Sequence, residues 1–381
     1  MIYLDHHATT PPSPAVIEAM GALMVTTWAN ASSQHAFGQA ARQALSGARA
    51  TVARVLGCKP AEVVFTSGAT EANHLAVRGL LGAAPAGRSR VVFSAVEHSG
   101  HLKLAQALAE AGVPVDVLPV TAEGGLDLAA AARLIGPDVA VVSLMAANNE
   151  TGVLMPVAEV AALARAAGAR LHVDATQWIG KQPFDFGAWG ADAVSFSGHK
   201  FNGPKGAGAL LLRQGATLRP TVPGSQERGR RGGTENLPAI VGMATALAAL
   251  GDLGSEASRL AALRDRLEAA LLTGLPDVHV WGRGLPRLPG VSFLRVGMWS
   301  ADVLLNRLER LGFAASSGAA CSSSGSEPSH VLTAMGVPPE EALGAVRLSL
   351  GRTTTDADIE ALVAALPALR SLLPSAEPAT A

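Results

Sequence analysis

The sequence predicts an α/β protein: a mostly parallel sheet covered by helices on both faces, followed by a smaller α/β domain. Before about residue 255, short continuous apolar runs alternate with Ala/Leu-rich helical patterns, which is typical of strands buried on both faces. After that point a long helix is followed by fewer, more widely spaced strands. The 381 residues are 49% hydrophobic and 16% charged, so the chain can bury a large core and exceeds one ordinary small domain.

The individual elements follow from these runs in chain order. The strands predicted in the larger part are at 62–66, 90–94, 115–119, 139–144, 170–174, 193–197 and 208–212, with helices at 71–81 and 101–111. Little helix is expected between the last two of these strands. The smaller part is predicted to contain helices at 256–273, 301–311 and 356–373 and strands at 290–296 and 346–350.

Charge and cysteine content exclude several classes of protein. The formal net charge of -1 provides no general attraction to nucleic acid or to an anionic membrane. The two cysteines, Cys58 and Cys321, imply no disulfide framework and favour an intracellular, cytoplasmic protein. Residues 1–7 lack the basic and apolar regions of a signal peptide, and no apolar run approaches the length of about 18 residues that a transmembrane helix needs.

Cys321 lies in a run, 316–326, that has no bulky side chain besides the thiol. Such a segment buries little surface, so we expect it to be mobile and exposed, which gives the thiol the access that its chemistry requires. The alternative is a chance cysteine in a surface loop. Residues 327–330 are predicted to begin a helix with Pro328 in its first turn, anchoring the far end of the loop. Cys58, between a helix and a strand, is expected to be passive.

Two polar residues stand at the ends of consecutive strands. Asp174 ends the strand at 170–174, and Lys200 follows the strand at 193–197. Taken singly, Asp174 is more simply a helix cap and Lys200 an exposed loop lysine. Together, at strand ends that line the ligand crevice of an open α/β sheet, they are what a pyridoxal phosphate site requires. The lysine forms the Schiff base, and the carboxylate keeps the pyridine nitrogen protonated.

A phosphate group would also need a binding site, and segment 66–73 can supply one. It joins a strand to a helix, and its small residues let backbone N–H groups and the helix N-terminus approach an anion. The segment matches neither a Walker loop nor a G-x-G-x-x-G motif, and ordinary helix capping is the alternative.

His98 follows the strand at 90–94, where it can cover a ring face and exchange protons near a reacting carbon. The rival interpretation is a metal site on His98 and His101, but no third ligand has suitable spacing, and His6-His7 are equally unconvincing as ligands. Segment 148–152 ends another strand; its amides could bond a ring hydroxyl and a substrate carboxylate, although Asn and Gly favour a turn there regardless.

These segments together resemble the cysteine desulfurases of the NifS/IscS type, which are pyridoxal-phosphate enzymes with the class V aminotransferase fold. The resemblance covers nearly the whole chain, from Tyr3 to Arg352. It is carried by Leu4-Asp5 with Ala8-Thr9-Thr10, Ser67-Gly68-Ala69-Thr70-Glu71, Glu97-His98, Asn148-Asn149-Glu150-Thr151-Gly152, Asp174-Ala175-Thr176-Gln177, Gly198-His199-Lys200, Arg231-Gly232-Gly233-Thr234-Glu235-Asn236 and Ser316-Ser317-Gly318-Ala319-Ala320-Cys321. The chain departs from many relatives at His6-His7 and at Ala31, and we expect neither difference to remove any chemistry.

The resemblance implies the fold of type I pyridoxal-phosphate enzymes, with a mostly parallel seven-stranded sheet in the large domain. The expected division is an N-terminal segment, 1–14, that packs with the small domain; a large cofactor-binding domain, 15–255; a small C-terminal domain, 256–373; and a disordered tail, 374–381.

It also implies a role for each site residue. Lys200 would be the Schiff-base lysine, Asp174 the partner of the pyridinium, and Cys321 the nucleophile that accepts sulfur, with His98 stacked on the ring and assisting proton transfer. Gln177 would contact the ring hydroxyl. The phosphate would be bound by Ala69, Thr70, Ser197 and His199, with Thr234 from the neighbouring subunit, and the substrate carboxylate by Asn149 and Arg347.

The implied activity is that of a dimeric desulfurase that converts L-cysteine to alanine and passes sulfur to an acceptor, either an iron–sulfur scaffold or a tRNA-thiolation protein. Three alternatives stay open at this point: a selenocysteine lyase, a class V aminotransferase or lyase in which Cys321 is incidental, and a non-catalytic sulfur carrier or assembly scaffold. The presence of both Lys200 and Asp174 argues against the last.

Overall fold

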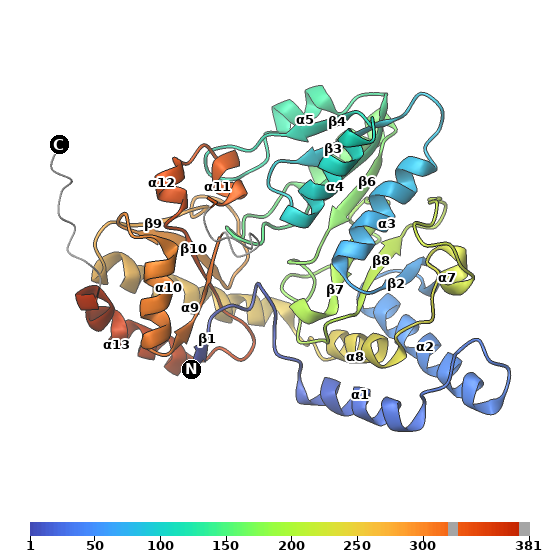
Figure 1. The fold of residues 1–381 in the computed structure, drawn as a ribbon, viewed down its shortest axis with the longest axis horizontal. Coiled ribbons are helices and arrows are strands. Elements are labelled where there is room, and N and C mark those ends of the chain that lie inside the picture. The colour runs from blue at the N-terminus through green and yellow to red at the C-terminus, as the bar shows by residue number, and fades with distance from the viewer. Residues whose placement is uncertain (319–326, 373–381) are drawn as a thin grey trace.

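The computed structural model describes residues 1–318 and 327–372, which form two bodies built on separate sheets (Figure 1). The larger body contains a seven-stranded sheet, and the smaller body a four-stranded sheet. The predicted α/β class and mostly parallel seven-stranded sheet are therefore confirmed. The predicted tail, 374–381, and Cys321 with its loop lie outside the described residues.

The larger sheet has the strand order β2-β8-β7-β6-β5-β3-β4. Its β8 runs antiparallel to both neighbours, β2 and β7, while the other adjacent strands are parallel. The strands are β2 (Val63–Thr66), β3 (Arg90–Ser94), β4 (Val115–Leu118), β5 (Val139–Met145), β6 (Arg170–Asp174), β7 (Ala193–Ser197) and β8 (Gly208–Leu212). The antiparallel direction of β8 explains why the sequence has little helix between β7 and β8, since an antiparallel pair needs no crossover helix.

The apolar strands are continuous because both faces of this sheet are covered. In β3, Val91 and Phe93 pack in one apolar core with helices α3 and α4, whereas Val92 packs in a second core on the opposite face. Side chains alternate between the two faces of a strand, so every position of such a strand must be apolar. The covering helices are α1 (Pro14–Thr26), α2 (Ala36–Val55), α3 (Ala69–Gly82), α4 (Ser99–Glu110), α5 (Leu128–Leu134), α6 (Val157–Ala167) and α8 (Leu237–Ala248), with a short α7 (Gln226–Gly229).

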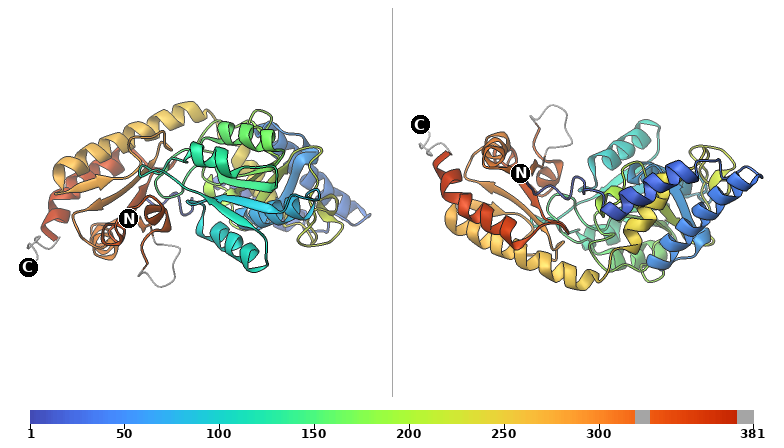
Figure 2. Two further views of the ribbon diagram at one scale, coloured as in Figure 1. Left: turned by 90° about the horizontal axis from the view of Figure 1, so that it is seen from above. Right: turned by 90° about the horizontal axis from the view of Figure 1, so that it is seen from below.

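The smaller body has its own apolar core between an antiparallel sheet, in the order β12-β13-β10-β9, and three helices. Its longest helix, α9 (Leu253–Gly274), begins with Leu253 against the core of the larger body and continues with Leu260, Leu263 and Leu267 in the second core. Figure 2 shows α9 running along the smaller body from the junction. The other elements are β9 (Val278–Val280), β10 (Val291–Val296), α10 (Ala301–Arg310), β11 (Phe313–Ala314), β12 (Ser316–Ser317), β13 (Val346–Ser349) and α13 (Asp356–Leu372).

The first residues of the chain lie against the smaller body. Strand β1 (Ile2–Tyr3) pairs in parallel with β11, and Leu4 is fully buried in the apolar core beside β13. Asp5 then forms a bridge with Ser349 before the chain continues to α1 in the larger body. Residues 2–10 therefore connect the two bodies.

The helix predicted to begin at 327–330 with Pro328 in its first turn begins slightly later in the structure. Helix α11 (His330–Ala334) begins after Ser329, whose hydroxyl accepts the backbone N–H of Leu332, so Pro328 precedes the cap and is not in the first turn. A serine hydroxyl satisfies an otherwise unpaired helix N–H and so fixes where the helix starts. Helix α11 is followed by α12 (Pro339–Ala342).

Across residues 1–318 and 327–372, no single helix is long and apolar enough to cross a membrane, and α8 with α9 reaches that length only as a pair bent by 82°.

Candidate active site

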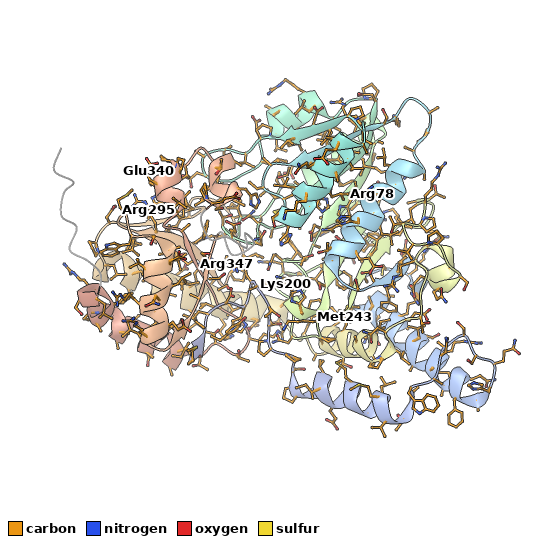
Figure 3. All side chains as sticks on the ribbon, viewed as in Figure 1. Arg78, Lys200, Met243, Arg295, Glu340 and Arg347 are labelled. Atoms are coloured by element: carbon orange, nitrogen blue, oxygen red, sulfur yellow. The ribbon has the colours of Figure 1, made fainter. Side chains whose placement is uncertain are left out.

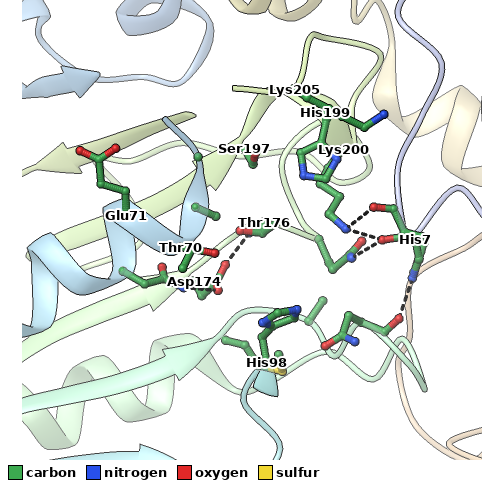
Figure 4. A pocket seen from close by; sticks show the side chains of 18 of the residues that line it. His7, Thr70, Glu71, His98, Asp174, Thr176, Ser197, His199, Lys200 and Lys205 are labelled. Atoms are coloured by element: carbon green, nitrogen blue, oxygen red, sulfur yellow. Dashed lines mark hydrogen bonds between the residues drawn. The ribbon is translucent and has the colours of Figure 1, made fainter. Parts of the chain in front are cut away.

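A pocket of about 570 Å³ opens at the carboxyl ends of β5, β6 and β7, where the two bodies and the N-terminal segment meet (Figure 4). Figure 3 shows Lys200 of the larger body and Arg347 of the smaller body at this junction, and both line the pocket. The pocket brings together most of the predicted site residues: Ala69, Thr70, His98, Asn149, Asp174, Gln177, Ser197, His199, Lys200 and Arg347.

Asp174, the last residue of β6, is 6% exposed and holds its carboxylate in a fixed orientation. The side-chain amide of Asn73 donates to Oδ2 at 2.7 Å, and the backbone N–H of Thr176 donates to Oδ1 at 2.9 Å. Burial alone would raise the pKa of Asp174, but the hydrogen bonds from Thr176 and Asn73 and the nearby His101 hold it below its usual value. The pocket therefore contains a buried carboxylate that stays ionised and can bind a protonated nitrogen.

A buried hydrogen-bonded chain lies behind Asp174. The hydroxyl of Ser195 donates to Asn73, His172 bonds Ser195 at 3.0 Å, and Ser143 bonds His172 and His101 at 2.8 and 2.9 Å. Burial lowers the pKa of His172 to about 3 and that of His101 to about 4, so both rings are neutral. His101 is thus engaged inside the protein, and the described part of the chain has no group of three His, Cys, Asp or Glu side chains able to hold a metal.

Lys200 ends a short 3-10 turn, Gly198–Lys200, directly after β7. Its Nζ donates to the backbone carbonyls of His7 at 2.5 Å and Ala8 at 2.8 Å, as the dashed lines in Figure 4 show. The Gln177 amide donates to the same His7 carbonyl at 2.9 Å. Lys200 and Asp174 therefore face one pocket from adjacent strands, and the N-terminal segment closes the side of the pocket next to the lysine.

The junction of β2 and α3 forms the opposite end of the pocket. Gly68 caps α3 without a side-chain bond, and Ala69 and Thr70 in the first turn line the pocket together with Ser197 and His199. A Cβ atom on Gly208 of β8 would come within 2.6 Å of the Gly68 Cα, so this close packing requires glycine. Unpaired N–H groups and the helix dipole make such a terminus favourable for an anion. Glu71 accepts the N–H of Ser67 at 2.7 Å, so the predicted capping interaction is present as well.

His98 and Arg347 approach the pocket from other sides. The Nδ1 atom of His98 accepts the backbone N–H of Gly100 at 3.2 Å, so Nε2 is the ring nitrogen that carries a proton. Arg347 is only 5% exposed; it donates to Asp5 Oδ1 and to the carbonyl of Asn149, both at 2.9 Å. Among the described residues, Arg347 Nε and Asn149 Oδ1 have no hydrogen-bond partner although both are buried. A buried donor and acceptor of this kind are suited to a ligand.

Cys321 is outside the described residues, although Ser317 and Gly318, just before its loop, line the pocket. Thr234 does not line this pocket; it lies in another cavity, beside Met24 and Trp28.

The sequence does not predict several residues that the structure brings to the site. Asn73 stands one helical turn after Ala69 on α3, so its i+4 spacing could have indicated it. Nothing in the sequence indicates the backbone carbonyl of His7, because a carbonyl group is common to all residues. Glu97 is fully buried beside this region, and burial, reinforced by the charge of Asp174, raises its pKa well above the usual value.

The comparisons with known proteins agree with this geometry. The model of the family described as "Aminotransferase class-V" matches residues 2–362. A cysteine desulfurase of Cereibacter sphaeroides is 44% identical, over 99% of this chain and 97% of that protein. A solved NifS-like protein superposes with a TM-score of 0.90 at 33% identity, covering 98% of this chain and 100% of the other. The structure of SspA in complex with cysteine has a TM-score of 0.82 at 29% identity and covers 92% and 99%. The chain therefore belongs to the aminotransferase class-V family, among its NifS-like cysteine desulfurases.

Proposed function

We propose that the protein is a pyridoxal 5′-phosphate-dependent L-cysteine desulfurase that releases alanine and transfers the sulfur atom to Cys321 as a persulfide. The observation that carries this proposal is the pairing of ionised Asp174 with Lys200 at the ends of adjacent strands, in one pocket. The relative from Cereibacter sphaeroides carries the name cysteine desulfurase, and one solved neighbour, SspA, is in complex with cysteine.

The residues of the pocket fit this cofactor in charge and in donor type. Asp174 is placed to hold a protonated pyridine nitrogen, and the open N-terminus of α3 with Ser197 and His199 is placed to bind the phosphate. Burial and the charges of Lys200 and Lys205 lower the pKa of His199 to about 4, so this ring is neutral and binds through hydrogen bonds rather than through charge. When bound, pyridoxal phosphate supplies the electron sink for the substrate carbon.

Side chains of the protein itself carry out proton transfer, substrate binding and attack on the sulfur. The amine of Lys200, once displaced by substrate, accepts the α-proton and returns a proton to the product, and His98 assists through its Nε2 atom. Arg347 and Asn149 bind the substrate carboxylate and so fix its orientation. Cys321, as a thiolate, would attack the substrate sulfur; the S–S bond of the persulfide would form as the C–S bond of the substrate breaks, and the electron pair of that C–S bond would stay on the substrate carbon, which takes up a proton to become the methyl group of alanine.

The direct test is to incubate the purified protein with cysteine and a thiol reductant and to measure sulfide and alanine together. Equal amounts of both products, without any added keto acid, are expected. A keto-acid-dependent transamination without sulfide would replace this proposal with the aminotransferase alternative, and a strong preference for selenocysteine would favour the lyase.

Arg347→Lys is expected to raise the KM for cysteine at least about tenfold, equivalent to about 1.4 kcal/mol. Lysine keeps the positive charge but loses the planar fork that binds a carboxylate with two hydrogen bonds. Steady-state kinetics measure the change. Arg352→Lys is the matched control, because Arg352 donates to the carbonyls of Ala249 and Leu250 and does not line the pocket. If the KM rises in the control and stays unchanged in Arg347→Lys, the assignment of the substrate carboxylate to Arg347 is wrong.

We further propose a two-fold dimer with the active sites at its interface. Helices α1 and α2 and the segment between them expose a group of large apolar side chains, and Trp28 and Phe37 of this group stack with their ring centroids 6.0 Å apart. The exposed members are Ile17, Met24, Val25, Trp28 and Phe37. Such a group usually marks a protein–protein contact, and most oligomers are two-fold symmetric. Thr234 lines a cavity with Met24 and Trp28 of this group, which supports a role for Thr234 at the phosphate of the partner subunit rather than at that of its own.

Thr234→Val is expected to weaken cofactor retention, and mixing it with Lys200→Ala should restore activity. In the heterodimer, one site combines an intact Lys200 from one subunit with an intact Thr234 from the other. Activity is measured after the two variants are unfolded and refolded together, with each refolded alone as the control. If Thr234 serves its own subunit, neither site is intact and no activity returns.

Two further proposals concern the acceptor of the sulfur and the division of the chain into domains. We propose that the acceptor of the sulfur is an iron–sulfur scaffold or a tRNA-thiolation protein in the cytoplasm. We also propose that residues 15–255 and 256–373 act as two domains, with segment 1–14 joined to the second; the separate apolar cores and the pairing of β1 with β11 support this division.

A further inference from the structure

A second lysine lies next to the pocket, linked to Lys200 by a short series of hydrogen bonds. Lys181 Nζ donates to Gln177 Oε1 at 2.9 Å, and Gln177 Nε2 donates to the carbonyl of His7 at 2.9 Å. Lys200 Nζ donates to the same carbonyl at 2.5 Å, which is the contact drawn in Figure 4. Lys181 follows Gln177 by four residues in the turns after β6, and the positive φ of 81° at Gly180 redirects the chain just before Lys181.

These contacts fix which end of the Gln177 amide faces which neighbour. A side-chain amide has one oxygen that accepts and one NH₂ group that donates, and it can be turned end for end at little steric cost. The His7 carbonyl can only accept, so it requires the NH₂ group, and Lys181 Nζ donates to the oxygen at the other end of the amide. Both neighbours therefore select the same orientation, in which Gln177 offers N–H donors on the pocket side.

The position of Lys181 is costly for a positive charge. Burial, followed by the charges of Lys200 and Arg347, lowers the pKa of Lys181 well below its usual value. An apolar side chain would fill the same space without this electrostatic cost. A basic group kept close to two other cations, beside a pocket, is more typical of a functional position than of packing alone.

We infer that Lys181 is a positioning residue for the cofactor: by holding the Gln177 oxygen, it keeps the N–H donors of Gln177 directed at the ring hydroxyl of pyridoxal phosphate. This inference rests on the proposed function. Without Lys181 only the His7 carbonyl opposes the turned orientation, in which the Gln177 oxygen would face both that carbonyl and the ring oxygen, two acceptors with which it forms no hydrogen bond. Lys181 acts only through Gln177 and does not itself take part in the reaction.

The test is a double-mutant cycle read out by cofactor binding rather than by turnover. The apoproteins of the wild type, Lys181→Met, Gln177→Ala and the double variant are titrated with pyridoxal phosphate, and Kd is taken from the absorbance change. Lys181→Met is expected to raise Kd about tenfold, or about 1.4 kcal/mol, and to have almost no further effect in the Gln177→Ala background. Lys181→Arg, which keeps a donor, should recover part of the loss.

The chain offers a matched control in Lys59, which also donates to a glutamine oxygen, Gln214 Oε1, at 2.6 Å, but on the surface away from the pocket. Lys59→Met is expected to leave Kd unchanged. If Lys181→Met does not fold, as judged by its thermal unfolding, Lys181→Gln takes its place in the cycle. An unchanged Kd in the Lys181 variant, or an equal loss with and without Gln177, overturns the inference. A wild-type protein that binds no pyridoxal phosphate instead overturns the proposed function.

Discussion

Lys200→Ala is expected to abolish turnover of cysteine, lowering the rate at least about a thousandfold, because the same amine both holds the cofactor covalently and moves the α-proton. The purified wild type should be yellow and the variant colourless after dialysis. Sulfide release and the absorption spectrum measure the two effects. Lys103→Ala, on the exposed face of α4, is the control and should retain both colour and rate.

Borohydride reduction followed by peptide mapping identifies the lysine that carries the cofactor. The tag is expected on Lys200 alone, since its Nζ lies on the pocket wall next to Gln177 and opposite the phosphate end. Lys205 also lines the pocket, and Lys181 lies close by, so both are available as competing sites. A tag on either of them would show that the Schiff-base lysine has been misassigned.

Cys321→Ser is expected to prevent persulfide formation and to lower sulfide release at least about a thousandfold. A serine hydroxyl is not ionised near neutral pH and is a poor nucleophile toward sulfur, whereas cofactor binding does not depend on this side chain. The variant should therefore stay yellow and still change its absorption spectrum when cysteine is added. Mass spectrometry of the protein after exposure to cysteine detects the added sulfur atom in the wild type and its absence in the variant.

Cys58 provides the control for this experiment within the same chain. Burial, with the nearby carboxylates of Glu62 and Asp185, raises the pKa of Cys58 to about 12, so its thiol is protonated at pH 8. Iodoacetamide at that pH is expected to modify Cys321 and to leave Cys58 untouched, and Cys58→Ala should keep the wild-type rate. Modification of Cys58 first, or full activity in Cys321→Ser, would contradict the nucleophile assignment.

The parts of the site that the sequence predicts are those determined locally. Asp174 and Lys200 each follow a strand that the apolar pattern reveals, and their strands, β6 and β7, are neighbours in the sheet as well as in the chain. The open helix start at Ala69 and Thr70 is likewise encoded within one strand–turn–helix unit. Local residue patterns are therefore sufficient for this half of the pocket.

The remaining parts depend on contacts between distant segments, which local patterns do not contain. Arg347 reaches Asp5 across 342 positions of the chain, and their pairing is fixed only when β13 and the N-terminal segment are packed together. Local patterns also do not indicate the His7 carbonyl and Lys181, because their roles depend on their positions in the folded chain rather than on residue type. The family resemblance predicts Arg347 as a site residue, but it does not predict Lys181.

The connection made by residues 2–10 has a consequence for the order in which a growing chain can build this pocket. During synthesis these residues are made more than three hundred positions before their partners in β11 and β13. The sheet of the larger body can form earlier, because its strands are complete by Leu212. The N-terminal segment must stay unpaired through that time, and the wall beside Lys200 closes only after β11 and β13 have been translated.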